Sequence, residues 1–156
     1  MKKTTFIFLL IVILWGMVIF YASSRSSKES NSNSKKIITY VLTKSISITN
    51  KYHITNIDLS NDNVSRMVLI INKPLRKVVH YLIYFVLAVF VYLLFYSLGC
   101  TRFKILIFTC LLCFFYSLTD EVHQTRVDGR TGQFLDCIID TSGAITSSLI
   151  LFFRKK

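Results

Sequence analysis

Ionisable and amide side chains lie beside apolar segments of this chain at three places that are far apart in the sequence. Carboxylates, imidazoles and cations in one site can exchange protons, bind phosphate or carboxylate groups, or hold a metal ion. The candidates for such a pocket are Arg76, Lys77, His80, Tyr84, Asp120, Glu121, His123, Gln124, Arg130, Asp136 and Asp140.

Helical spacing groups several of these residues. Arg76, His80 and Tyr84 are four residues apart, so in a helix they share one face. Asp136 and Asp140 are also four apart, and Asp140 would lie roughly 6 Å deeper in the membrane than Asp136. A carboxylate at that depth is unfavourable unless it is paired or hydrated. We therefore expect Asp140 to have a partner on a neighbouring helix.

Small side chains follow on the same helix, and they let a neighbouring helix approach closely: Gly143, Ala144 and Ser147. This helix should pack the face that carries both aspartates inward, against the helices bearing Arg76, His80 and Glu121.

Two interpretations of these groups remain open. In the structural one, the cations Arg76, Lys77 and Arg130 neutralise the carboxylates and hold the helices together. In the functional one, the groups form a pocket that recognises or transforms a ligand. A metal ion is not predicted, because Glu121 and His123 are two residues apart and do not share a helical face. No cofactor is predicted either.

The elements that must position these groups are membrane helices. Hydrophobic residues make up 53% of the 156 residues and occur in blocks, and a bilayer crossing needs about 20 mostly apolar residues. The pattern predicts an all-α polytopic membrane protein, a bundle of four transmembrane helices near residues 6–21, 78–98, 105–119 and 134–153. The chain then divides into a first transmembrane helix (1–22), an extracytoplasmic polar segment (23–74) and a three-helix membrane core (75–156).

The polar segment has two predicted parts. Residues 23–36 are rich in Ser, Lys and Asn, which favours a flexible linker. The apolar residues Val64, Met67, Val68 and Ile71 recur at helical spacing, which predicts a short amphipathic surface helix before the second span. We expect Pro74 to end that helix.

The first block also fits a signal peptide, since lysines precede it and Ala22-Ser23-Ser24 follow it. We favour an uncleaved span. Cys110 and Cys113 form a C-x-x-C pattern inside an apolar run and are interpreted as buried thiols that pack like small hydrophobic groups.

The net charge of +11 does not indicate nucleic-acid binding, because the cations flank the apolar blocks. The two termini and the turn at residues 99–104 carry seven cations and no acid, whereas the loop at 120–133 carries two cations and three acids. Both termini are therefore predicted to be cytoplasmic and the polar cluster extracytoplasmic.

Four motifs, in this order and spacing, resemble the VanZ-like family: LRKVVHY at 75–81 with Tyr84, TDEVHQ at 119–124, GRTG at 129–132 and DCIIDTSGA at 136–144. YASS at 21–24 adds to the match. The resemblance implies a protein of the bacterial cytoplasmic membrane with a role in reduced susceptibility to glycopeptide antibiotics, teicoplanin in particular. Asp128 stands where the family usually has proline, which could loosen the turn before Arg130.

Two classes of function follow. The protein could bind a lipid-linked cell-wall precursor or a lipoglycopeptide at the outer face of the membrane and so lower the access of the drug. Alternatively, it could be an enzyme that acts on a lipid or lipid-linked cell-wall substrate through its acidic and histidine residues. A transporter is not favoured, because the four spans contain no internal inverted repeat. The expected partners are the lipid bilayer and one of these ligands, and no nucleic acid.

Overall fold

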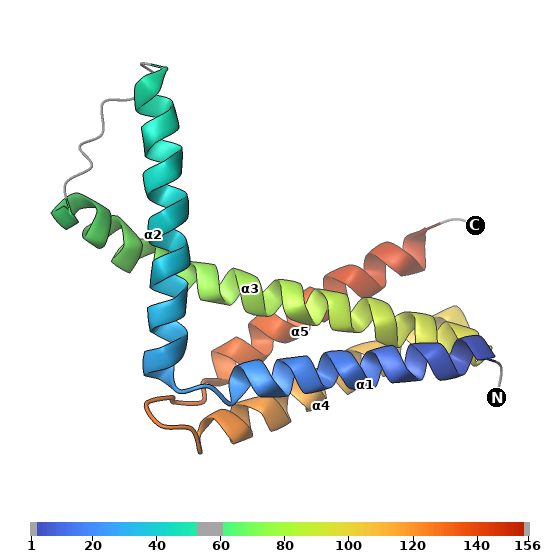
Figure 1. Ribbon diagram of the computed structural model, residues 1–156. Helices are drawn as coiled ribbons and strands as arrows, with labels where there is room; N and C mark the ends of the chain where they lie inside the picture. The colour runs from blue at the N-terminus through green and yellow to red at the C-terminus, as the bar shows by residue number, and fades with distance from the viewer. Residues whose placement is uncertain (1–2, 53–60, 155–156) are drawn as a thin grey trace. The chain divides into compact units, whose positions relative to one another are not determined.

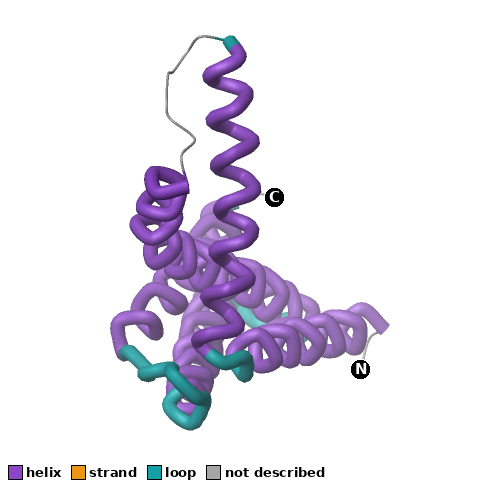
Figure 2. Tube along the Cα trace, turned by 60° about the vertical axis from the view of Figure 1, so that its left-hand side comes forward, coloured by secondary structure: helices purple, strands orange, loops and turns teal. Residues whose placement is uncertain are grey.

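The computed structural model describes residues 3–52 and 61–154, and the regular elements among them are five helices (Figures 1 and 2). Their bounds are α1 Lys3–Ser23, α2 Ser27–Lys51, α3 Asn61–Ser97, α4 Arg102–Gln124 and α5 Phe134–Phe153. Loops drawn in teal in Figure 2 join α1 to α2, α3 to α4 and α4 to α5.

Four of the helices, α1, α3, α4 and α5, are long and apolar enough to cross a membrane. Each has at least 18 residues, enough to approach the thickness of the hydrocarbon layer at a rise of about 1.5 Å per residue. The predicted all-α fold with four membrane helices is therefore confirmed.

The chain separates into two compact units. The membrane unit consists of Met1–Arg25 and Lys77–Lys156, and the hairpin unit consists of Ser26–Arg76. Helix α3 contributes its first part to the hairpin unit and its longer second part to the membrane unit.

In the membrane unit, consecutive spans run in opposite directions, so that the end of α1, the end of α4 and the start of α5 lie at one end of the bundle (Figure 1). The core is built on a stripe of α3 in which Tyr84, Leu87 and Val91 recur at three- and four-residue intervals and are almost completely buried. Ile19 of α1 and Cys113 of α4 pack against this stripe.

Hydrogen bonds to backbone carbonyls fix helix α1 to its neighbours, and the longest of those described runs from the Thr5 hydroxyl to the carbonyl oxygen of Ser97 at 3.4 Å. Two others are shorter. The Trp15 Nε1 donates to the carbonyl oxygen of Ile83 on α3 at 3.1 Å. The Tyr116 hydroxyl of α4 donates to the carbonyl oxygen of Gly16 at 2.6 Å. Each of these bonds satisfies a polar group that would otherwise be costly in an apolar surrounding.

Helix α5 lies close against the backbone of α3 at Gly143. A Cβ atom at this position would collide with the carbonyl oxygen of Tyr81 and lie 3.3 Å from the backbone nitrogen of Phe85. The prediction that small residues bring this helix close to its neighbour is confirmed, and the close approach sets the spacing of the polar groups one turn away.

The prediction of a flexible linker at residues 23–36 is wrong, because α2 begins at Ser27. The side chain of Ser26 caps this helix by accepting a hydrogen bond from the backbone nitrogen of Glu29. Ile38 of α2 then packs against Val64 and Val68 of α3. Serine and asparagine favour loops locally, but this long-range packing stabilises the helix.

The predicted helix break at Pro74 is also wrong. The amphipathic residues Val64 to Ile71 lie in α3, which continues through Pro74 into the second membrane span. A proline removes one helical hydrogen bond, and strongly apolar residues follow it in the helix. Such prolines are tolerated in membrane helices when the rest of the helix is well supported.

Candidate functional site

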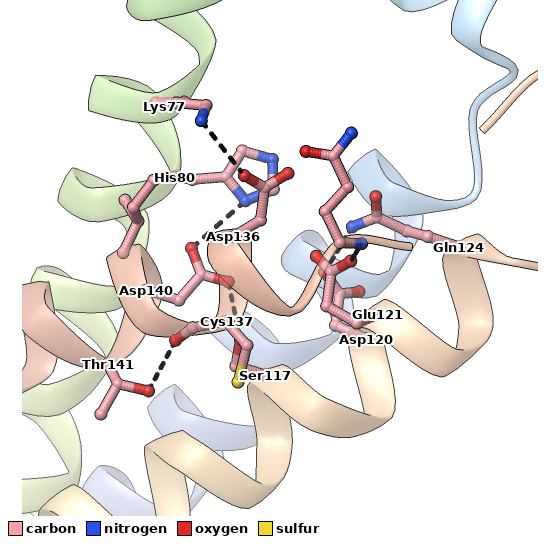
Figure 3. A network of polar contacts seen from close by, with 12 residues as sticks. Lys77, His80, Ser117, Asp120, Glu121, Gln124, Asp136, Cys137, Asp140 and Thr141 are labelled. Carbon is pink, nitrogen blue, oxygen red and sulfur yellow. Dashed lines mark hydrogen bonds and ion pairs between the residues drawn. The ribbon is translucent and has the colours of Figure 1, made fainter. Parts of the chain in front are cut away.

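Polar residues of α3, α4 and α5 meet at one end of the membrane unit (Figure 3). Seven of the predicted site residues belong to this polar cluster: Lys77, His80, Asp120, Glu121, Gln124, Asp136 and Asp140. They come from the start of the membrane part of α3, the end of α4 and the start of α5.

Asp140 is the innermost member of the cluster and has no exposed surface. The Ser117 hydroxyl of α4 donates a hydrogen bond to its Oδ2 at 2.8 Å. The Nδ1 of His80 on α3 lies 3.3 Å from its Oδ1. The expected partner of the deep carboxylate therefore exists, and it joins three helices.

The two outer members of the cluster form a looser pair. The Nζ of Lys77 lies 4.0 Å from Oδ1 of Asp136, and the two side chains are 43% and 27% exposed. An exposed ion pair at this distance contributes only about 0–1 kcal/mol to stability. Polarity therefore changes with depth, from a buried carboxylate to an accessible ammonium group.

The carboxylates at the end of α4 are held by short local contacts. The Gln124 Nε2 donates to Oδ2 of Asp120 at 3.0 Å, and the backbone nitrogen of Gln133 donates to Oε2 of Glu121 at 2.7 Å. The other oxygens, Asp120 Oδ1 and Glu121 Oε1, are buried and have no hydrogen-bonding partner among the described residues. A side chain at Gly132 would meet the carbonyl oxygen of Glu121 at 2.7 Å, so this glycine lets the loop pass over the helix end.

Four predicted site residues are not among these seven. Arg76 belongs to the hairpin unit, where its Nη1 donates to Oδ1 of Asn31 at 2.9 Å. Tyr84 lies one turn after His80 and is fully buried in the apolar core. Arg130 lies in the loop between α4 and α5.

His123, the fourth, faces α1 instead of the cluster. Its ring stacks on Phe20 with centroids 4.3 Å apart, and its Nε2 lies 3.0 Å from the Ser24 hydroxyl oxygen. The expectation that Glu121 and His123 do not share a helical face is confirmed, because Glu121 contacts the loop before α5.

Residues 6–155 match the family described as VanZ/LLP1. The chain belongs to the VanZ/LLP1 family. No curated protein and no solved structure gives a significant match. With four candidate spans, this VanZ/LLP1 chain is a multi-pass membrane protein.

Two members of the VanZ/LLP1 site were not predicted from the sequence, Ser117 and the backbone of Gln133. The sequence does point to Ser117, because this residue lies three positions before Asp120 and four before Glu121, on the same helical face. No local pattern identifies Gln133, whose backbone reaches Glu121 only because the loop folds back over α4.

The VanZ/LLP1 site can bind an anionic group or move a proton. The ammonium group of Lys77 is accessible and only loosely paired, so it can engage a phosphate or a carboxylate. The imidazole of His80 is 26% exposed, and a carboxylate beside Nδ1 leaves Nε2 for an incoming group. In the part of the chain that the structure describes, no three histidine, cysteine or carboxylate side chains are grouped to hold a metal ion.

Proposed function

We propose that the polar cluster binds the polar head of a lipid-anchored ligand at the extracytoplasmic face of the bacterial membrane. Through this binding the protein lowers susceptibility to glycopeptide antibiotics such as teicoplanin. The observation that carries the proposal is a gradient of solvent exposure across the cluster. It runs from buried Asp140, through half-buried His80, to the accessible ammonium group of Lys77. At the exposed rim of the cluster, an anionic head group meets hydrogen-bond donors. A fixed carboxylate lies beneath these donors.

A purely structural role explains this gradient less well. A cluster that serves only to hold helices together gains from short, water-excluded pairs, because exposed pairs contribute little. The Lys77–Asp136 pair is long and accessible. The charges nearest the entrance are therefore poor cross-links but well suited to a ligand.

The orientation is part of the proposal. The termini and the turn at residues 99–104 carry seven cations and no acid, which favours the cytoplasmic side for both termini. The cluster lies at the opposite end of the bundle, where lipid-linked cell-wall precursors and lipoglycopeptides meet the membrane. Either of these has the combination of polar head and membrane anchor that the site requires.

The test is expression in a susceptible Gram-positive host, with teicoplanin and vancomycin tolerance measured in parallel. Teicoplanin carries an acyl chain that concentrates it at the membrane, so its tolerance should rise more. His80→Asn and Asp136→Asn should abolish the gain while membrane abundance, measured by quantitative immunoblotting, stays near wild type.

Asp128→Asn is the matched control, since Asp128 is an exposed loop carboxylate outside the cluster. It should keep full tolerance. Equal shifts for both drugs, or a loss of tolerance that always follows a loss of protein, would contradict the proposal.

A second candidate function is an enzyme acting on a lipid or lipid-linked substrate. The specific observation in its favour is the position of Asp140 beside Nδ1 of His80, which orients the imidazole and leaves Nε2 to act as a general base. Lipid profiles of membranes carrying wild type and His80→Gln distinguish the two functions. An enzyme yields a product that is absent from the variant, whereas a binding protein changes only the lipids that copurify with it.

A further inference from the structure

An apolar groove of about 550 Å³ runs along the contact between α1 and α4. Its α1 side includes Val12, Gly16 and Phe20, and its floor includes Leu87 of α3. Met17 and Phe20 are more than half exposed, whereas Leu87 is 2% exposed. The groove is thus open along one side and closed beneath.

The polar side chain that lines the groove, Tyr116, already has a hydrogen-bonding partner. Tyr116 lines the groove, but its hydroxyl donates to the carbonyl oxygen of Gly16 at 2.6 Å. A Cβ atom at Gly16 would lie 3.4 Å from this hydroxyl oxygen, which is an ordinary van der Waals contact. The remaining wall presents hydrocarbon, and in a membrane span the ligand that matches it is a hydrocarbon chain.

One end of the groove is polar, and cations follow it closely in the sequence. Phe20 closes that end and stacks on His123, and the Nε2 of His123 lies 3.0 Å from the Ser24 hydroxyl oxygen. Arg25 follows Ser24 directly and lies over the ring of Tyr21, and Arg126 follows His123 by three residues. Val12 and Phe20 are eight residues apart, so the apolar part extends about 12 Å along α1.

We propose that the groove binds one acyl chain of an anionic membrane phospholipid, with its head group beside His123 and Ser24. The chain fills the space between α1 and α4, and the cations after these helices complement the phosphate. The site is separate from the polar cluster of Lys77, Asp136 and Asp140, and it does not depend on the function proposed for that cluster.

The experiment uses the full chain in vesicles of phosphatidylcholine and phosphatidylglycerol. The probe is phosphatidylglycerol with a photoactivatable acyl chain, and the labelled residues are mapped by mass spectrometry. Labelling should concentrate on residues 12–20 of α1 and 112–116 of α4. Met17→Trp fills the groove from an exposed position and should lower this labelling about tenfold, because excluding two buried methylene groups is sufficient for that change.

Val18→Trp is the matched control. Val18 is 56% exposed against 55% for Met17, but it does not line the groove. Its labelling should equal that of wild type. A second variant, Arg126→Gln, leaves the groove intact and should reduce only the preference for phosphatidylglycerol over phosphatidylcholine carrying the same photoactivatable chain.

Three results would overturn the proposal. Equal labelling of wild type and Met17→Trp would mean that the groove is not the site. Labelling spread evenly over the lipid-facing residues of α5 would mean that only ordinary bilayer contact was detected. Competition by unlabelled polyprenyl phosphate but not by phosphatidylglycerol would assign the groove to an isoprenoid chain.

Discussion

Replacing Gly143 with alanine tests whether helix spacing controls the polar cluster. The added Cβ would collide with the carbonyl oxygen of Tyr81 and lie 3.1 Å from its carbonyl carbon. These are backbone atoms, which cannot rotate out of the way as a flexible side chain can. Helix α5 must therefore move away from α3.

The expected energetic cost is that of overpacking, about 1–3 kcal/mol in the free energy of unfolding. The same displacement acts on the cluster, because Asp140 lies one turn from Gly143 and His80 is the neighbour of Tyr81. Their contact is an ion pair with 3.3 Å between Nδ1 of His80 and Oδ1 of Asp140, and its attraction falls as α5 moves away from α3. The variant should therefore lose the His80–Asp140 contact while it still folds.

The assay combines two measurements. Thermal stability in detergent, followed by the monodisperse fraction on size-exclusion chromatography, should fall. Teicoplanin tolerance of the expressing host should fall to background even where membrane abundance is largely retained. Both results are needed, because a loss of stability alone does not report on the site.

Gly99→Ala is the control, because it should lower stability without displacing the polar cluster. Gly99 has a φ of +79° and nothing within 4 Å of an added Cβ, so the substitution strains only the turn before α4. The strain costs about 1–2 kcal/mol. If both variants lost tolerance to the same extent, or if Gly143→Ala were as stable as wild type, the reasoning would be refuted.

Two further predictions concern orientation and the buried carboxylate. In a cysteine-free background and in intact cells, an impermeant thiol reagent should modify Cys introduced at Thr125 but not at Thr101, and the reverse pattern would place the cluster in the cytoplasm. Ser117→Ala should lower the free energy of unfolding by about 1.5–3 kcal/mol, because it removes a donor to the buried carboxylate of Asp140. Ser147→Ala, whose equally buried hydroxyl bonds only to a carbonyl oxygen of its own helix, should cost less in the same thermal assay, and equal costs would contradict this account.

The membrane helices and the centre of the site could be predicted because they depend on local periodicity. Apolar blocks of sufficient length identify the spans. The four-residue spacing of His80 and Tyr84 places both on the inner face of α3, and Gly143 marks the close contact of α5. In each case the spacing along a single helix decides which face of that helix carries the residue.

The errors arose where contacts far along the chain decide the outcome. Arg76 shares a helical face with His80, but its long side chain reaches Asn31 of the hairpin unit. The sequence around Asn31 favours a loop, but packing of Ile38 against α3 stabilises the helix that contains it. His123 is a residue type that often occurs in functional sites, but its ring stacks on Phe20 and faces α1.

The hydrogen bond from Trp15 to α3 supplies a spectroscopic test of whether the first helix is kept. Trp15 is the single tryptophan of the chain, and it lies before the Ala22-Ser23-Ser24 sequence at which a signal peptidase could cut. Cleavage there would remove all tryptophan emission from the mature protein. If α1 stays, the indole should emit at short wavelength from an apolar surrounding, and lipids with brominated chains should quench it. One fluorescence spectrum of the protein purified from membranes therefore distinguishes a four-span protein from a three-span one.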